Sequence, residues 1–191
     1  NIATDLTAAD TGEAITWKKE LADATTSADA LLRRLGLEHL ISDIDIHTTF
    51  KCLVPDSYIK KIKKGDINDP LLRQVLPLSA EADSMIQQQG LLDPVGDLAA
   101  TAAPGLLHKY HGRSLLISTG ACAVHCRYCF RRHYPYQHSS CSTSEIDKAL
   151  HYLHDNTDIE EIILSGGDPL VLDNKKLQAL REEGAGGTPP L

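Results

Sequence analysis

The 191-residue sequence lacks several features that define whole classes of protein. No stretch approaches the roughly 20 consecutive apolar residues of a membrane-spanning helix, so no membrane span is expected. The N-terminus lacks the charged-then-apolar pattern of a signal peptide, so export is not expected. Basic residues are in the minority, with 19 lysines and arginines against 26 acidic residues and a formal net charge of -7. A nucleic acid or a membrane surface would require a basic footprint, and neither is therefore expected as a partner.

The cysteines lack the even number and wide spacing of a secreted disulfide scaffold. There are five of them, and Cys122, Cys126 and Cys129 fall within eight positions. Clustered thiols in a protein that is not exported are typical of metal ligands that the cell keeps reduced. The sequence therefore predicts a cytoplasmic protein with a metal centre.

The first part of the chain, residues 1–106, is predicted to be a mainly helical region. Residues 27–36 and residues 69–77 each combine an N-cap residue, an apolar face and a stop signal, which together predict a helix. Residues 50–54 could form a short strand, and residues 55–64 a helix that ends at a glycine.

A different pattern follows a loop-like stretch at residues 93–105, which is expected to link the two parts of the chain. Short apolar runs at residues 113–119 and 159–164 are typical of buried parallel strands. A helix-like segment follows each run, at residues 144–153 and 174–182. Two strands that alternate with two helices indicate the start of a parallel α/β sheet or barrel.

The predicted fold class is therefore α/β. The N-terminal helical region precedes residues 107–181, which are predicted to form the first βα units of a (β/α) barrel. Two strands cannot close a barrel, so the barrel is expected to be incomplete in this chain. Residues 182–191 are low in complexity and lack a core pattern, which predicts an atypical tail.

The segment that carries chemistry has the pattern C-x3-C-x2-C, formed by Cys122, Cys126 and Cys129. Cysteine thiolates hold iron–sulfur clusters, and four of them complete a 4Fe–4S cluster. Three ligands leave one iron open, and an open coordination position allows a metal centre to act as a catalyst. Tyr128 precedes the third cysteine, and a predicted strand precedes the loop. The whole pattern resembles the signature of the radical S-adenosylmethionine (SAM) superfamily.

Other kinds of site remain open on the residues alone. A structural zinc site could recruit His125, His133, His138 or Cys141, although such a site prefers two pairs of ligands and a closed shell. An electron-transfer centre could use Cys141 as its fourth thiolate ligand. Arginine and aromatic residues alternate over residues 127–136, which would suit nucleic-acid stacking, but the acidic net charge disfavours that interpretation.

A second motif, Ser165-Gly166-Gly167-Asp168-Pro169, follows the second predicted strand. Ligands of parallel α/β folds bind at the carboxyl ends of the strands, and glycine permits a close approach of the backbone. Alone, this segment is typical of an ordinary turn. One strand downstream of the cysteines, it resembles the superfamily element that holds the methionine amino group of SAM. That resemblance assigns SAM binding to Ser165, Gly166, Gly167 and Asp168.

Further segments resemble the lysine 2,3-aminomutase family, namely residues 104–113, 129–136 and 165–170, together with residues 69–77. The resemblance extends over nearly the whole chain, from about residue 13 to about residue 180. Within this family the sequence is most similar to the bacterial branch that makes (R)-β-lysine for the modification of elongation factor P.

This resemblance implies an isomerase that converts L-lysine to (R)-β-lysine by moving the amino group from C2 to C3. The implied cofactors are a 4Fe–4S cluster, SAM and pyridoxal 5′-phosphate (PLP), which carry the reaction chemistry. The implied partners are L-lysine as the substrate, an external electron donor, and a functional link to elongation factor P and its lysyl ligase. The alternatives are another radical SAM enzyme or a non-catalytic iron–sulfur or zinc module.

The same resemblance assigns roles to individual residues outside the two motifs. Tyr110 and Arg113 fall where the family contacts PLP, and Arg131 falls where it grips the substrate carboxylate. Arginine suits phosphate and carboxylate groups because its planar fork pairs with two oxygens. Tyr128 would lie beside the adenine of SAM.

The resemblance also implies that one group is missing. The family's lysine that binds PLP covalently belongs to a C-terminal half that is expected to lie outside this chain. Lys175 and Lys176 follow the glycine motif directly and do not match its position. No catalytic residue beyond the cluster ligands is therefore assigned.

Overall fold

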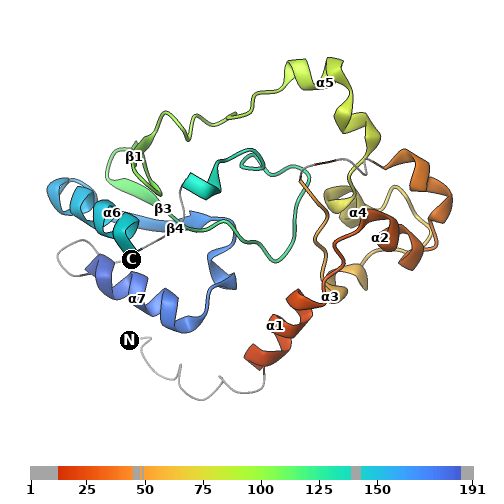
Figure 1. The fold of residues 1–191 in the computed structure, drawn as a ribbon, viewed down its shortest axis with the longest axis horizontal. Helices are drawn as coiled ribbons and strands as arrows, with labels where there is room; N and C mark the ends of the chain where they lie inside the picture. Colours follow the sequence, from red (N-terminus) through yellow and green to blue (C-terminus); the bar gives the residue numbers. More distant parts are fainter. Residues whose placement is uncertain (1–12, 45–47, 49, 139–142, 186–191) are drawn as a thin grey trace. The chain divides into compact units, whose positions relative to one another are not determined.

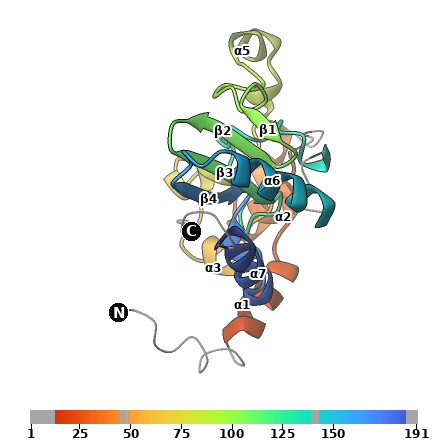
Figure 2. The ribbon, with the colours of Figure 1, turned by 90° about the vertical axis from the view of Figure 1, so that its left-hand side faces the viewer.

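The computed structural model describes residues 13–44, 48, 50–138 and 143–185 (Figure 1, Figure 2). The chain forms two compact units. The first consists of Asn1–Gln89 with Ala123–Cys129, and the second of Gly90–Cys122 with Phe130–Leu191. The sequence predicted different limits, with domains at residues 1–106, 107–181 and 182–191. These domain limits remain predictions. No helix within the described ranges is long and apolar enough to span a membrane.

The first unit is mainly helical. Its helices are α1 (Glu13–Ala22), α2 (Ala28–Arg34), α3 (Asp56–Ile59), α4 (Pro70–Val75) and α5 (Ser84–Gln89), with the 3₁₀ helices η1 (Glu38–Asp43) and η2 (Ser79–Ala82). The Ser27 hydroxyl caps α2 by accepting a hydrogen bond from the Ala30 N–H at 3.4 Å. The Asp69 carboxylate caps α4 by accepting from the N–H groups of Leu71 and Leu72 at 2.8 and 3.1 Å. The two helices that the sequence predicted from these caps are therefore confirmed.

Two other predictions in this unit are wrong. The strand predicted for residues 50–54 is reduced to an isolated antiparallel bridge between Thr25 and Val54. The helix predicted after it is also shorter, since α3 ends at Ile59. The chain leaves the helix because the Lys63 N–H donates at 3.0 Å to the carboxylate that caps α4, instead of continuing the helical pattern.

The core of the first unit combines these helices with the chain between them. Apolar side chains of α2 and α4 are fully buried, as is Val54. Val124, which lies between the first and second clustered cysteines, packs against this core. The core includes Leu31, Leu32, Leu35, Leu37, Val54, Leu72 and Val75.

The second unit contains a four-stranded sheet in the order β1-β2-β3-β4. Its strands are β1 (Thr101–Ala103), β2 (Leu106–Tyr110), β3 (Arg113–Thr119) and β4 (Glu161–Gly166). Its helices are α6 (Thr143–Asp155) and α7 (Asn174–Ala185), with the 3₁₀ helices η3 (Tyr136–His138) and η4 (Pro169–Val171). Strands β3 and β4 are parallel, with α6 in the connection, which confirms the predicted strand–helix–strand unit. The structure is mixed α/β.

The sequence prediction missed half of this sheet. Strand β1 lies within the stretch predicted as a loop, and both β1–β2 and β2–β3 are antiparallel pairs. The turn between β1 and β2 is Pro104-Gly105, and Gly105 adopts a φ of 73°. Proline followed by a left-handed glycine is the signature of a type II turn, so this dipeptide makes a hairpin rather than a linker. The predicted count of two strands is therefore wrong.

Helices α6 and α7 cover one face of β3 and β4. Leu116 and Ile162 from the strands pack with Leu153 of α6 and Leu180 of α7 in one buried cluster. Side chains alternate along a strand, so the neighbouring strand residues lie on the opposite face, where Ile163 is 37% exposed. Ser165 belongs to that second face. That second face is not uniformly exposed, since Leu107 and Ile117 on it are each 1% exposed.

The packing of α6 on the sheet gives a first prediction. Replacing Leu153 with Ala should lower the free energy of unfolding by about 2–5 kcal/mol, because Leu153 is 1% exposed and its loss leaves a cavity. Leu91→Ala is the matched control, since Leu91 is 75% exposed in the same unit. Urea unfolding followed by circular dichroism measures both. Equal losses in the two variants would contradict this description of the core.

Candidate functional site

The clustered cysteines follow β3. Cys122 belongs to the second unit, whereas Cys126 and Cys129 belong to the first. All three are half-buried, and a turn joins the last two through a hydrogen bond from the Cys129 N–H to the Cys126 carbonyl at 3.1 Å. Within the described ranges, no three His, Cys, Asp or Glu side chains gather closely enough to hold a metal ion. The set of three ligands therefore remains a prediction from the sequence.

The chemistry of the donors nevertheless fits an iron–sulfur cluster. Cys126 and Cys129 carry free thiols that are partly accessible. Cys52 differs, because it is 3% exposed and its burial raises the pKa of its thiol to about 11, which disfavours the thiolate form that binds metal. Cys141 lies outside the described residues. The thiols of the C-x3-C-x2-C segment stay the predicted ligands of a 4Fe–4S cluster.

Tyr128, predicted to lie beside the SAM adenine, stands between the last two cysteines. Its side chain is exposed, at 68% of its full accessibility, and its hydroxyl lies 3.4 Å from the Gln74 amide oxygen. A hydrogen bond with the Cys126 side chain raises the pKa of Tyr128, with a smaller effect of the nearby thiol charges. The ring is therefore accessible on the side of the cysteine turn.

The glycine motif lies at the carboxyl end of β4, and its backbone is bonded to the loop that follows β3. The Gly167 N–H donates to the Thr119 carbonyl at 2.7 Å, and the Asp168 N–H donates to the Ala121 carbonyl at 2.8 Å. Gly166 has a φ of 114°, and a Cβ atom there would lie 2.3 Å from the Thr119 carbonyl oxygen. A Cβ atom on Gly167 would lie 2.1 Å from the Ala121 carbonyl oxygen. Both positions therefore require glycine, because two backbone segments meet there.

Ser165 and Asp168 flank the two glycines and are both engaged. The Ser165 hydroxyl accepts a hydrogen bond from Arg131 Nη1 at 2.8 Å, and its carbonyl accepts from the Ser118 hydroxyl at 3.0 Å. Asp168 caps the 3₁₀ helix η4 by accepting from the Leu170 N–H at 3.0 Å. The motif predicted to bind SAM is therefore an ordered turn that also contacts Arg131.

Arg131, predicted to grip the substrate carboxylate, is 8% exposed and forms a buried ion pair with Asp97. Its Nε lies 2.7 Å from Asp97 Oδ2. The sequence analysis missed Asp97, because the stretch from Asp93 was interpreted as a linker. The available signal was Asp93 itself, whose carboxylate accepts from the N–H groups of Asp97 and Leu98, both at 2.9 Å, and so forms a turn. Asp residues favour such turns.

Tyr110 and Arg113, predicted to contact PLP, are brought together at the other end of the sheet. They are paired across the β2–β3 turn, in which Gly112 adopts a φ of 76°. Arg113 Nε lies 3.3 Å from the Glu161 carboxylate, and both side chains are more than half exposed. Thr119 is six residues further along β3, or roughly 20 Å. Tyr110 and Arg113 therefore form a second candidate subsite, separate from the glycine motif.

Part of this chain matches the model of a known protein family. Residues 116–188 match the family model described as the Radical SAM superfamily. This segment contains β4, the glycine motif and the three clustered cysteines. The predicted resemblance to the radical SAM superfamily is therefore confirmed.

The relatives in this comparison are L-lysine 2,3-aminomutases. The protein from Escherichia coli (strain K12) is 41% identical over 86% of this chain and 48% of its own length. Those from Buchnera aphidicola and Haemophilus influenzae are 37% and 38% identical over 85% and 84% of this chain, each over 48% of its own length. The chain thus spans about half the length of the curated relatives it matches, and within the superfamily it is related to the lysine 2,3-aminomutases. This relationship implies a 4Fe–4S cluster, SAM and PLP as cofactors.

The close approach at the glycine motif gives a second prediction. Gly166→Ala should combine the strain of a left-handed residue, about 1–2 kcal/mol, with a backbone clash of about 1–3 kcal/mol. Gly96→Ala is the matched control, because Gly96 has a φ of 70° in the same unit and open space around it. Thermal unfolding should show a larger loss for Gly166→Ala than for Gly96→Ala. Equal losses would show that the two loops do not meet as described.

The turn at Asp93 gives a third prediction, which concerns pH. Hydrogen bonds from the backbone N–H groups of Leu98 and Asp97 lower the pKa of Asp93 below its ordinary value. A lowered folded-state pKa stabilises the fold above the unfolded pKa of about 3.9, and this contribution is lost as pH falls through the folded pKa. Asp93→Asn should therefore be less stable than wild type at neutral pH, with a gap that narrows below about pH 4. Urea midpoints across this range measure the gap, and a constant gap would contradict the assignment.

Proposed function

We propose that the protein is a radical SAM isomerase that converts L-lysine to (R)-β-lysine by 2,3-amino migration. The proposal is supported by the radical SAM match and by relatives that are named L-lysine 2,3-aminomutase. It concerns the activity of the whole protein, because the matched relatives extend over about twice the length that this chain covers.

One observation in the structure supports this proposal most directly. The hydrogen bond from the Asp168 N–H to the Ala121 carbonyl brings the glycine motif next to the residue that precedes Cys122. A radical SAM enzyme must bind SAM beside its cluster, so the SAM-binding turn and a cluster ligand have to be neighbours. Two glycines allow the motif to pack directly against the loop that leads to Cys122, as a SAM site beside the cluster would require.

The chain's own residues would divide the work of binding among them. The cluster with SAM supplies a radical, and PLP supplies an electron sink for the migrating amino group. Cys122, Cys126 and Cys129 would hold the iron. Because the N–H groups of Gly167 and Asp168 already donate to the loop after β3, the turn would meet the SAM ammonium group with its oxygen atoms. Ser165 and Gly166 complete this proposed binding turn, and Tyr128 would pack beside the adenine.

Tyr110 and Arg113 are the proposed contacts of the PLP phosphate. The ion pair between Arg113 and Glu161 is more than half exposed, so it contributes little stability and Arg113 can exchange its partner at small cost. A phosphate with two negative charges competes well for a guanidinium that only one exposed carboxylate holds.

Arg131 is the proposed contact of the substrate carboxylate. A guanidinium has five N–H donors, and Asp97 and Ser165 use those on Nε and Nη1. The described residues supply no hydrogen-bond acceptor to Nη2, so donors remain for a carboxylate. Asp97 would fix the orientation of the Arg131 guanidinium. The substrate carboxylate would then form a second ion pair with the same positive charge.

The remaining parts of the proposal concern the fold and the cell. The four-stranded sheet is proposed to be part of a (β/α) radical SAM barrel. An external electron donor is proposed to reduce the cluster. The product, (R)-β-lysine, is proposed to be used by a lysyl ligase that modifies elongation factor P. This modification is proposed to take place in the cytoplasm.

The fourth prediction tests the cluster. Anaerobic reconstitution of the 191-residue chain with iron and sulfide should give the visible absorption of a 4Fe–4S cluster. Replacing Cys122, Cys126 or Cys129 with Ala should abolish that absorption. Cys52→Ala should retain it, because the Cys52 thiol is buried with a raised pKa. Cys141→Ala should also retain it, and its loss in that variant would refute the set of three ligands.

The whole protein, rather than the 191-residue chain, separates the alternatives when it is reconstituted in the same way and SAM, PLP, a reductant and L-lysine are added. Formation of β-lysine supports the proposed reaction. Formation of 5′-deoxyadenosine without β-lysine would assign a different radical SAM reaction to these residues. Bound metal without any cleavage of SAM would assign a non-catalytic iron–sulfur or zinc module.

A further inference from the structure

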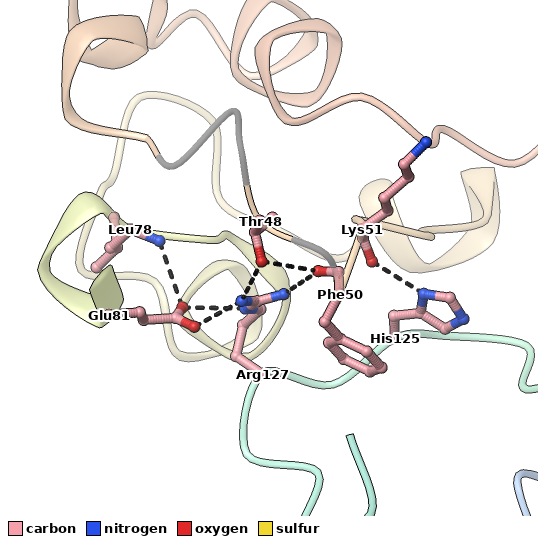
Figure 3. Close-up of polar contacts among 7 residues, drawn as sticks. All are labelled: Thr48, Phe50, Lys51, Leu78, Glu81, His125 and Arg127. Carbon is pink, nitrogen blue, oxygen red and sulfur yellow. Dashed lines mark hydrogen bonds and ion pairs between the residues drawn. The ribbon is translucent and has the colours of Figure 1, made fainter. Parts of the chain in front are cut away.

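The segment that carries the second and third clustered cysteines is held by side chains and backbone of the helical region in the first unit. Figure 3 shows the contacts, which converge on Arg127. Only two residues separate Cys126 from Cys129, and Arg127 is one of them, so its position fixes that of Cys126. The Arg127 N–H also donates to the Gln74 carbonyl at 2.7 Å, which ties the backbone of the turn directly to α4.

Arg127 is anchored through all three nitrogens of its guanidinium. Nε and Nη2 bond the two carboxylate oxygens of Glu81 at 3.0 and 2.5 Å, and Nη1 donates to the Phe50 carbonyl at 2.5 Å. Nη2 also lies 3.4 Å from the Thr48 hydroxyl. The residue is 9% exposed. A guanidinium this enclosed is placed to hold the chain rather than to bind a ligand from solution.

Glu81 is itself fixed by its own segment. The Leu78 N–H donates to Glu81 Oε1 at 3.3 Å, and Glu81 lies in the 3₁₀ helix η2. The carboxylate therefore presents both oxygens in a set direction, and the paired arrangement with Arg127 is bidentate. Such a pair specifies direction as well as distance, which a single lysine contact would not do.

A second anchor lies one residue before Cys126. The His125 N–H donates to the Leu53 carbonyl at 3.0 Å. His125 Nδ1 lies 2.9 Å from the Lys51 carbonyl (Figure 3). The imidazole stacks on the Phe50 ring with centroids 5.0 Å apart, and the Arg127 guanidinium lies 5.4 Å from the same ring. The residues on both sides of Cys126 are therefore fixed by residues 50–53.

We propose that the Arg127–Glu81 ion pair, closed by the Phe50 carbonyl, positions Cys126 and Cys129 for the cluster. Arg127 and Glu81 are then positioning residues of the metal centre. The helical region contributes to this centre, because its side chains and carbonyl groups orient the cysteine ligands. Residues that orient metal ligands typically change metal affinity about 10–100-fold when they are replaced. This inference rests on the proposed function, because it takes both cysteines as cluster ligands.

The test is the rate at which a chelator removes iron from the anaerobically reconstituted 191-residue chain. Arg127→Gln and Glu81→Gln should each release iron roughly 10–100-fold faster than wild type. The double variant should release it no faster than Arg127→Gln, because that single change already removes the ion pair with Glu81. Arg34→Gln is the control, since it breaks an exposed ion pair with Asp56 in the same unit and should leave the rate unchanged.

Each outcome has a separate meaning. If wild type holds no cluster, the proposed function fails. If wild type holds a cluster that Cys126→Ala loses, but Arg127→Gln releases iron at the wild-type rate, this inference alone is overturned. Equal effects of Arg127→Gln and Arg34→Gln would overturn it as well. Should Arg127→Gln not fold, Arg127→Lys takes its place, because lysine keeps the charge and loses the bidentate contact.

A spectroscopic measurement separates positioning from a contribution to stability alone. The electron paramagnetic resonance spectrum of the reduced cluster should change in Arg127→Lys, because the orientation of its cysteine ligands changes. A variant that only weakens the fold would lower the unfolding midpoint of the metal-free chain and leave that spectrum as in wild type. That result would refute the positioning role.

Discussion

Two backbone hydrogen bonds, from Gly167 to Thr119 and from Asp168 to Ala121, hold the carboxyl ends of β3 and β4 together beyond the last strand residues. The parallel pairing of the two strands brings their carboxyl ends to the same edge of the sheet, as in other α/β folds. Without glycine at 166 and 167, the two loops could not approach this closely. The position of the glycine motif, which is proposed to bind SAM, beside the loop that leads into Cys122 depends on this constraint.

Arg127 and Arg131 lie close together in the sequence but have different proposed roles. Arg127 anchors the chain, whereas Arg131 keeps hydrogen-bond donors for a ligand. Arg127 has contacts on all three guanidinium nitrogens, whereas the described partners of Arg131 bind Nε and Nη1. Each pairs with an acid that precedes it in the chain, Glu81 or Asp97, so each buried charge is compensated. The count of remaining donors distinguishes a residue that anchors the chain from one that can still bind a carboxylate.

Structural features that depend on residues close together in the sequence could be predicted, whereas contacts between distant residues could not. The caps of α2 and α4 and the apolar run of β3 depend on neighbours within a few residues, and these elements were predicted correctly. The hairpin at Pro104-Gly105 was missed because the same dipeptide suits a linker. The pairs Arg127–Glu81 and Arg131–Asp97 join residues 46 and 34 positions apart, and no local pattern marks such partners. The cysteine motif stands out in the sequence because its spacing is itself local.

The contacts of Arg127 and His125 involve a part of the chain in which similarity to the aminomutases reaches beyond the radical SAM segment. The superfamily match begins at residue 116, yet the Escherichia coli relative aligns over 167 residues, so much of that alignment must lie in the N-terminal region. That region contributes Glu81 and the carbonyl groups of residues 50, 51 and 53 to the segment between the cysteines. These directed hydrogen bonds hold the residues on both sides of Cys126, and the N-terminal region and residues 123–129 accordingly belong to one compact unit.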